Sequence, residues 1–123
     1  MMAKTVLVVE DDPSLRIVAE EMFTAAGFEV ESVQRADHAV DLVAQRSEQT
    51  AFLFTDVQTP GPIDGIDLAR LVKTHWPHIE VLVTSGGSVS EAALPDGVRF
   101  TSKPWSCKEV LEIARTAVAT WAS

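Results

Sequence analysis

The chain has 123 residues, 46% of them hydrophobic, which is the length of one domain and enough apolar material to bury a core. Ten basic and eighteen acidic residues give a formal net charge of −8, which argues against direct nucleic-acid binding because phosphate backbones would be repelled. The apolar stretch at residues 6–9 is too short for a signal peptide or membrane span, and the single cysteine, Cys107, excludes an internal disulfide, so we expect a cytoplasmic chain without membrane contact.

The first half of the chain alternates between strand and helix patterns. Residues 5–10 are apolar and β-branched without polar alternation, which is typical of a central parallel strand. Asp12 and Pro13 then form a helix start, with apolar residues at helical spacing up to Gly27. A weaker strand at 28–33 and a helix at 36–46 repeat the pattern.

The second half continues the alternation. Residues 51–56 form another apolar run that ends in an acid, a turn cluster follows, and residues 66–72 mark a helix. After a fourth strand at 79–84, residues 88–94 leave room for only about two helical turns before the next proline. The last strand is predicted at 98–102, and Ser106 would cap a final helix. 

Five strands that alternate with five helices predict a parallel sheet covered on both faces. We therefore expect an α/β fold: a doubly wound, five-stranded parallel sheet of order 2-1-3-4-5, in a flavodoxin-like three-layer sandwich. We interpret residues 1–123 as one domain, with no room for an output domain. In such folds ligands bind beyond the carboxyl ends of the strands, between strands 1 and 3.

Polar side chains gather at these predicted strand ends. Carboxylates held together in one pocket must be protonated or neutralised by a cation, and oxygen ligands without histidine or cysteine favour Mg²⁺ over zinc. A carboxylate facing a phosphoryl group can act as the nucleophile, with a metal ion and a lysine offsetting the developing charge. The residues are Glu10, Asp11 and Asp12 after strand 1, Asp56 in strand 3, Thr84 and Ser85 in strand 4, and Ser102 and Lys103 in strand 5.

Five short motifs occur in order along nearly the whole chain: Val8-Val9-Glu10-Asp11-Asp12-Pro13, Thr55-Asp56-Val57-Gln58-Thr59-Pro60, Asp64-Gly65, Val83-Thr84-Ser85 and Lys103-Pro104. In order and spacing they resemble the response regulator receiver domain of bacterial two-component systems. The resemblance implies a phosphorylated signalling switch, not an enzyme acting on a substrate. It also implies that Asp56 accepts a phosphoryl group from a sensor histidine kinase or a histidine phosphotransfer protein.

The resemblance further implies the role of each site residue. Asp11 and Asp56 would bind Mg²⁺ directly, Gln58 through its backbone carbonyl and Glu10 mostly through water, whereas Asp12 caps the helix. Thr84 and Lys103 would contact the phosphoryl group. Phe100 falls at the family's aromatic switch position, which follows the movement of the threonine, and the peptide bond before Pro104 would be cis.

The chain departs from the family pattern at two places. Thr59 replaces the usual methionine, and the loop at 60–64 is one residue longer than usual. The segment 85–97 is shorter than in most receivers, which predicts a reduced fourth helix on a face through which many receivers signal.

Other functions fit these motifs less well. An aspartate-nucleophile phosphatase would place its two acids two residues apart, whereas Asp11 and Asp12 are adjacent, and a flavin carrier would need a phosphate-binding loop where the chain is acidic. A receiver-shaped adaptor that binds partners without phosphorylation remains the main alternative. The downstream protein target is unknown, and relay, phosphate sink, direct effector and phosphorylation-dependent homodimer all stay open.

Overall fold

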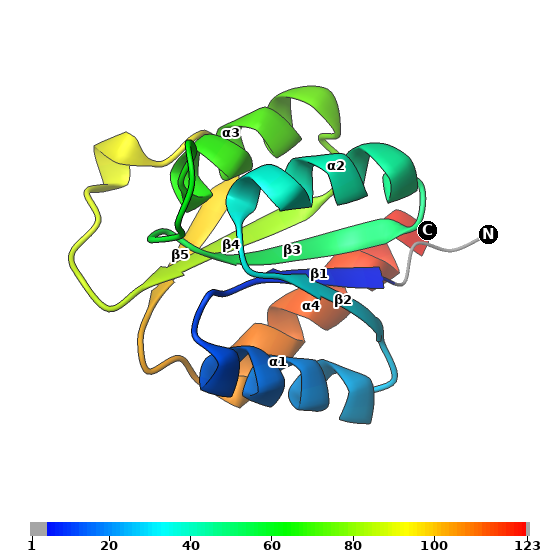
Figure 1. The fold of residues 1–123 in the computed structure, drawn as a ribbon. Coiled ribbons are helices and arrows are strands. Elements are labelled where there is room, and N and C mark those ends of the chain that lie inside the picture. Colours follow the sequence, from blue (N-terminus) through cyan, green and yellow to red (C-terminus); the bar gives the residue numbers. More distant parts are fainter. Residues whose placement is uncertain (1–4, 123) are drawn as a thin grey trace.

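The strands and helices alternate along the chain as the sequence predicts (Figure 1). The computed structural model describes residues 5–122, so residues 1–4 and 123 of the predicted domain lie outside the described residues. The elements are β1 (Thr5–Val9), α1 (Pro13–Ala25), β2 (Glu29–Val33), α2 (Ala36–Arg46), β3 (Thr50–Asp56), α3 (Gly65–His75), β4 (Glu80–Ser85), the 3₁₀ turn η1 (Glu91–Ala93), β5 (Val98–Ser102) and α4 (Cys107–Ala122).

The sheet has five parallel strands in the order β2-β1-β3-β4-β5. Figure 1 shows α1 and α4 on one face of this sheet and α2 and α3 on the other. The predicted doubly wound, flavodoxin-like architecture is confirmed. Among residues 5–122, no helix combines the length and apolar character needed to cross a membrane.

The central strands bury both of their faces. In β1, Val6 and Val8 pack into the core beneath α1 and α4, whereas Leu7 and Val9 pack into the core beneath α2 and α3. Successive side chains of a strand point to opposite faces, so a strand covered on both sides needs a continuous apolar run. This is why the uninterrupted run at the start of the chain correctly predicted a central strand.

The segment between β4 and β5 contains no α-helix, only the single turn η1. The fourth of the five predicted helices is therefore absent as an α-helix, and the expectation that it is reduced is confirmed. Pro95 cannot continue a helix, and Gly97 adopts a positive φ of 81° immediately before β5. Four α-helices, rather than five, therefore accompany the five strands over the described residues.

Candidate functional site

Three strands end at the same edge of the sheet and carry the polar residues there. Asp56, the last residue of β3, is the register partner of Thr84 in β4, and Glu10 directly follows β1. The N–H of Val57 donates a 2.9 Å hydrogen bond to the carbonyl of Thr84, which extends the pairing just past Asp56. Parallel pairing therefore brings the predicted side chains of β1, β3 and β4 together.

Three carboxylates form an acidic cluster at this edge. One carboxylate oxygen each from Glu10, Asp11 and Asp56 lie within 4.8 Å of one another. Glu10 and Asp56 are buried, and Asp11 is exposed. A set of hard oxygen donors, open to solvent on the Asp11 side, fits a Mg²⁺ ion, which prefers carboxylates and retains several waters.

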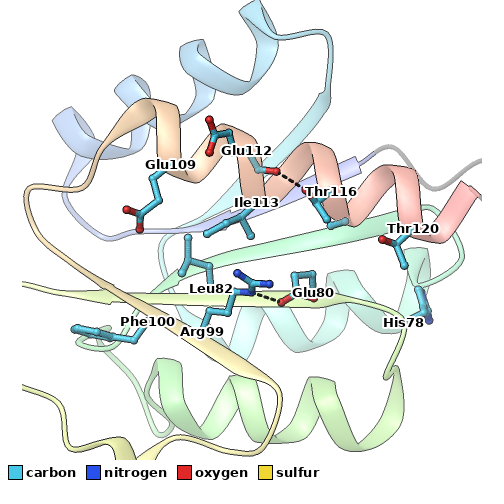
Figure 2. A pocket seen from close by; sticks show the side chains of 11 residues that line it. His78, Glu80, Leu82, Arg99, Phe100, Glu109, Glu112, Ile113, Thr116 and Thr120 are labelled. Carbon is cyan, nitrogen blue, oxygen red and sulfur yellow. Dashed lines mark hydrogen bonds and ion pairs between the residues drawn. The ribbon is translucent and has the colours of Figure 1, made fainter.

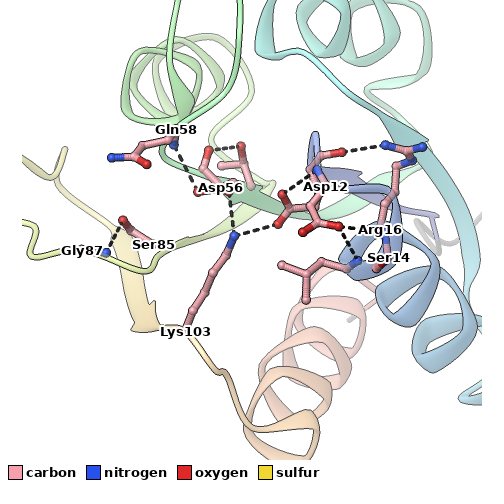
Figure 3. A network of polar contacts seen from close by, with 11 residues as sticks. Asp12, Ser14, Arg16, Asp56, Gln58, Ser85, Gly87 and Lys103 are labelled. Carbon is pink, nitrogen blue, oxygen red and sulfur yellow. Dashed lines mark hydrogen bonds and ion pairs between the residues drawn. The ribbon is translucent and has the colours of Figure 1, made fainter.

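Lys103 connects two of these acids. Its amine donates hydrogen bonds of 2.7 Å to Oδ2 of Asp56 and 3.0 Å to Oε1 of Glu10 (Figure 3). Burial lowers the pKa of Lys103, but the hydrogen bonds to the two carboxylates outweigh burial and raise it above its ordinary value. Lys103 is therefore a fixed positive charge beside Asp56 at neutral pH.

Glu10 accepts hydrogen bonds at both its side chain and its backbone carbonyl. Its Oε2 accepts a 3.2 Å hydrogen bond from the N–H of Asp12, and its carbonyl accepts one of 3.0 Å from Arg16 (Figure 3). Burial is the main reason that the pKa of Glu10 is raised, because a charged carboxylate loses hydration there, and the nearby Asp56 adds to the effect. A cation bound nearby would therefore favour the charged form of Glu10.

Asp12 turns away from the acidic cluster, as predicted. Its side chain accepts hydrogen bonds from the N–H groups of Ser14 and Leu15, and Pro13 follows at the first helical position. This arrangement is an N-cap, which satisfies the free N–H groups at the start of α1. The interpretation of Asp12 as a helix cap is confirmed.

The loop after β3 fits closely against Asp56. The N–H of Gln58 donates a 3.1 Å hydrogen bond to Oδ1 of Asp56, and the side chain of Gln58 is exposed. A Cβ atom on Gly65 would lie 2.0 Å from the carbonyl oxygen of Asp56, so only glycine fits there. The motif Asp64-Gly65 is visible in the sequence, but the structure alone shows that Gly65 lets α3 begin against Asp56.

Thr84 carries an unsatisfied hydroxyl. The residue is 2% exposed, and its Oγ1 makes no hydrogen bond within the described residues. A buried hydroxyl without a hydrogen-bond partner lowers the stability of the fold, because its lost hydration is not replaced. In native proteins such a group calls for an explanation, for example a functional role or a bound ion. The small pocket that Thr84 lines is shared with Glu10 and Asp56, so this hydroxyl is available to a group bound beside Asp56.

Three further residues, Pro104, Phe100 and Trp105, lie outside the acidic cluster. The peptide bond between Lys103 and Pro104 is cis. Phe100 does not join the acidic cluster: it pairs with Val83 in register and packs, half-buried, against the core beneath α2 and α3. Trp105 packs against the core, as the sequence predicts: its ring meets that of Phe54 edge-on, with the ring centroids 5.2 Å apart, and it also lines the same pocket as Thr84. No spacing signal marks its place in this pocket, because it comes from the loop after β5.

Comparisons with known proteins agree with this geometry. The family model of the response regulator receiver domain matches residues 6–115. The response regulator protein FleR of Pseudomonas aeruginosa is 34% identical over 122 residues, covering 95% of this chain and 25% of that protein. The DNA-binding transcriptional regulator NtrC of Proteus hauseri is 29% identical over 122 residues, covering 96% of this chain and 25% of that protein.

A solved structure shows the same fold. The response regulator receiver domain protein from Clostridium thermocellum superimposes with a TM-score of 0.86 at 18% identity, covering 95% of both chains. The chain spans about a quarter of the length of the curated relatives described above. The similarity to those relatives therefore concerns about a quarter of each of them.

Proposed function

Because the chain belongs to the response regulator receiver domain family, we propose that Asp56 is the phosphoacceptor of a two-component phosphorelay. The chain is a signalling module rather than a conventional enzyme. The observation that supports Asp56 most directly is that it belongs to a cluster of acids that suits a divalent cation and lies 2.7 Å from the amine of Lys103.

The proposed chemistry is one phosphoryl transfer. A carboxylate oxygen of Asp56 forms a bond to phosphorus while the bond from phosphorus to the donor's imidazole nitrogen breaks, which leaves an acyl phosphate on Asp56 and a free histidine on the donor. Lys103 holds its positive charge beside the phosphoryl oxygens, and the hydroxyl of Thr84 donates a hydrogen bond to one of them. The N–H of Gln58 orients the carboxylate through its hydrogen bond to Oδ1.

We assign the metal site to Glu10, Asp11, Asp56 and the backbone carbonyl of Gln58. A bound Mg²⁺ supplies positive charge that offsets the charge on the transferring phosphoryl group. Asp11 is exposed, so solvent reaches the acidic cluster on that side. Glu10 and Asp56 are buried, which limits the movement of their side chains. Glu10 acts through water in this assignment.

The phosphodonor is a sensor histidine kinase or a histidine phosphotransfer protein. The receiver needs a surface for such a protein close to Asp56, and α1 offers one. Ile17 and Val18, in the second turn of this helix, are 51% and 48% exposed, although large apolar side chains are usually buried. This apolar pair lies on the helix that Asp12 and Arg16 anchor beside the acidic cluster.

Phosphorylation then switches protein–protein interactions in the cytoplasm. In this proposal Thr84 moves toward the phosphoryl group and the ring of Phe100 moves with it. The change at Asp56 is thereby transmitted to β5, where a second copy of the chain or another protein target can bind. Relatives such as NtrC are DNA-binding regulators, but the charge of −8 disfavours direct nucleic-acid binding by this chain itself. For this reason we propose that the switch acts on protein partners and not directly on nucleic acid.

Intact-mass analysis after incubation with acetyl phosphate tests the function. The native chain should gain one phosphoryl group only when Mg²⁺ is present, and Asp56→Asn should gain none. Asp96→Asn is the matched control, because this exposed aspartate lies next to Gly97 before β5, outside the acidic cluster, and should leave the gain intact. If neither acetyl phosphate nor any histidine phosphodonor labels the native chain, the chain is a receiver-shaped adaptor.

A further inference from the structure

The loops that follow β2 and β3 meet at the edge of the sheet where the acidic cluster lies. These two strands flank β1, and the N–H of Glu10 donates a 3.1 Å hydrogen bond to the carbonyl of the last residue of β2. The β3–α3 loop, residues 57–64, contains Gln58, to which we assigned a metal ligand. The side chain of Arg35, from the loop after β2, contacts Gly61 in this loop.

Arg35 is held in one orientation by Asp37. Its Nε and Nη2 donate hydrogen bonds of 2.9 and 2.8 Å to the two carboxylate oxygens of Asp37, in the first turn of α2. Two parallel hydrogen bonds of this kind fix the plane of the guanidinium as well as its position. The two side chains are only partly exposed, at 37% and 29%. The guanidinium is therefore a rigid surface against which a neighbouring loop can pack.

Gly61 lies against the flat face of this guanidinium. A Cβ atom on Gly61 would lie 2.8 Å from Nη2 and 3.1 Å from both Cζ and Nε of Arg35. Similar distances to three atoms indicate the face, since Asp37 already occupies the edge formed by Nε and Nη2. Gly61 also has a φ of 104°, which residues with a side chain rarely adopt. The loop thus requires glycine here both for its backbone conformation and for its contact with Arg35.

Other contacts fix the two ends of the β3–α3 loop. The N–H of Gln58 donates to Oδ1 of Asp56, and Ile63 packs against the core beneath α2 and α3. The hydroxyl of Thr59 donates a 3.4 Å hydrogen bond to the carbonyl of Ile63. Arg35 supports the middle of the loop, between these two ends. The direction of the Gln58 carbonyl depends on the course of the residues that follow it, and Arg35 restricts that course.

We propose that Arg35 is a positioning residue that holds the β3–α3 loop, and with it the backbone carbonyl of Gln58, in the arrangement that binds the cation. The inference rests on the proposed function, because it concerns the same metal site. Mg²⁺ requires nearly ideal octahedral geometry with ligand oxygens at about 2 Å, so a small displacement of one carbonyl weakens binding. Groups that only orient a metal ligand commonly change the affinity for the metal about 10- to 100-fold.

Isothermal titration of Mg²⁺ into the full, unphosphorylated chain tests the proposal. Arg35→Ala should bind Mg²⁺ about tenfold more weakly than the native chain. The direction of this change excludes a charge effect, because the loss of a positive charge would by itself tighten the binding of a cation. Arg35→Lys keeps the charge but not the flat guanidinium, so it should bind Mg²⁺ as weakly as Arg35→Ala.

Two other arginines serve as matched controls, because each forms an exposed ion pair away from the β3–α3 loop. Arg46, at the far end of α2, pairs with Glu31 at 2.9 Å. Arg99 pairs with Glu80 at 3.2 Å in the groove that α4 leaves beside β5 (Figure 2). Arg46→Ala and Arg99→Ala should bind Mg²⁺ at least as tightly as the native chain.

Gly61→Ala tests the contact from the loop side. The added methyl group would displace the guanidinium, so this variant should also bind Mg²⁺ about tenfold more weakly. If both residues act through one contact, Arg35→Ala/Gly61→Ala should bind no more weakly than Gly61→Ala alone. Gly27→Ala is the control for backbone strain: Gly27 has a φ of 95°, but a Cβ atom there would meet nothing within 4 Å, so Mg²⁺ binding should not change.

Phosphorylation by acetyl phosphate gives a second readout. For Arg35→Ala, the Mg²⁺ concentration that gives half the maximal rate should rise about tenfold, whereas the rate at saturating Mg²⁺ should stay close to that of the native chain. Native Mg²⁺ affinity in Arg35→Ala or Arg35→Lys, or additive losses in the double variant, would overturn the role of Arg35 alone. A native chain that binds no Mg²⁺ would contradict the proposed function and, with it, this inference.

Discussion

The amine of Lys103 lies 2.7 Å from Oδ2 of Asp56, although 47 positions separate the two residues in the chain. Lys103 reaches this position because its own N–H continues the pairing of β5 with β4, through a 2.9 Å hydrogen bond to the carbonyl of Ser85. The same amine contacts Glu10, so one ammonium group neutralises part of the charge of two proposed metal ligands. In the proposed mechanism Lys103 is consequently both a competitor of the cation and a contact for the phosphoryl group.

Lys103→Met should separate these two effects. Removal of the ammonium should tighten Mg²⁺ binding about tenfold, because a positive charge is lost close to the ligands. Phosphorylation by acetyl phosphate should nevertheless fall about 100-fold, because a charge that stabilises the transition state is lost. Isothermal titration and intact-mass time courses measure the two quantities.

Lys108→Met is the control for that variant, because Lys108 is exposed on α4 and has no ion pair within the described residues. It should change neither quantity. Weaker Mg²⁺ binding by Lys103→Met would contradict the idea that Lys103 competes with the cation.

Thr84→Val should stabilise the fold while slowing phosphorylation. Its hydroxyl is buried without a partner, so replacing it with a methyl group of similar size should raise the free energy of unfolding by about 1 kcal/mol. Thr55→Val is the matched control: that hydroxyl is buried too but donates a 3.0 Å hydrogen bond to the carbonyl of Asp56, so its loss should be destabilising. Urea denaturation compares the two, and a destabilised Thr84→Val would show that the hydroxyl has a partner in solution.

Gly65→Ala should disturb Asp56 through the backbone. The added methyl group would lie 2.0 Å from the carbonyl of Asp56, so α3 or the strand end has to move, at a cost of about 1–3 kcal/mol. Phosphorylation should fall as well, since the position of the carboxylate changes. Gly86→Ala serves as the control for stability, because a Cβ atom there would meet nothing within 4 Å; equal melting temperatures of the two variants would refute the steric argument.

The pKa of Glu10 gives a pH-dependent prediction. Burial raises this pKa above the ordinary value of 4.5, so the neutral form is favoured in the folded chain. The resulting stabilisation is complete below the unfolded-state pKa and is lost as the pH rises through the raised pKa of folded Glu10. Without Mg²⁺, Glu10→Gln should therefore gain stability relative to the native chain as the pH rises above the ordinary glutamate pKa, until folded Glu10 is fully charged.

Urea denaturation in the presence of a chelator measures that difference at each pH. Addition of Mg²⁺ should stabilise the native chain more than Glu10→Gln, because the carboxylate then faces a cation. A stability difference that is independent of pH would rule out Glu10 as the titrating group.

Replacing Ile17 and Val18 with alanine should affect only protein phosphodonors. The double variant keeps good helix formers on α1 but removes the exposed apolar surface. Transfer from a phosphorylated histidine phosphotransfer protein or kinase should slow about tenfold, whereas labelling by acetyl phosphate should stay unchanged. Equal slowing with both donors would indicate a disturbed acidic cluster instead of a lost docking surface.

Local sequence signals correctly predicted much of the fold. The uninterrupted apolar run of β1 requires a strand buried on both faces, and Asp12-Pro13 marks the start of α1, as the structure confirms. The short segment at residues 88–94 also allowed a correct prediction. It has too few residues for a full helix, and the structure has only the turn η1 there. These predictions succeed because each depends on residues that are neighbours in the sequence.

The site was predictable only in part. The acids and Lys103 could be identified because parallel strands deliver their carboxyl ends to one edge, a rule that needs no side-chain geometry. The rule does not say which acid Lys103 contacts or that Trp105 lines the pocket. It also does not show that the hydroxyl of Thr84 is left without a hydrogen bond.

Periodicity and local steric preferences act over a few residues, so they predicted the alternation of strands and helices, the capping residue of α1 and the polar residues at the strand ends. The bridge from Lys103 to Glu10 and Asp56, and the contact of Gly65 with the carbonyl of Asp56, follow only from the packing of the folded chain. The same is true of the groove that α4 leaves beside β5. These features depend on distances between segments far apart in the chain, which the packing of helices on the sheet sets to within a fraction of an atomic diameter.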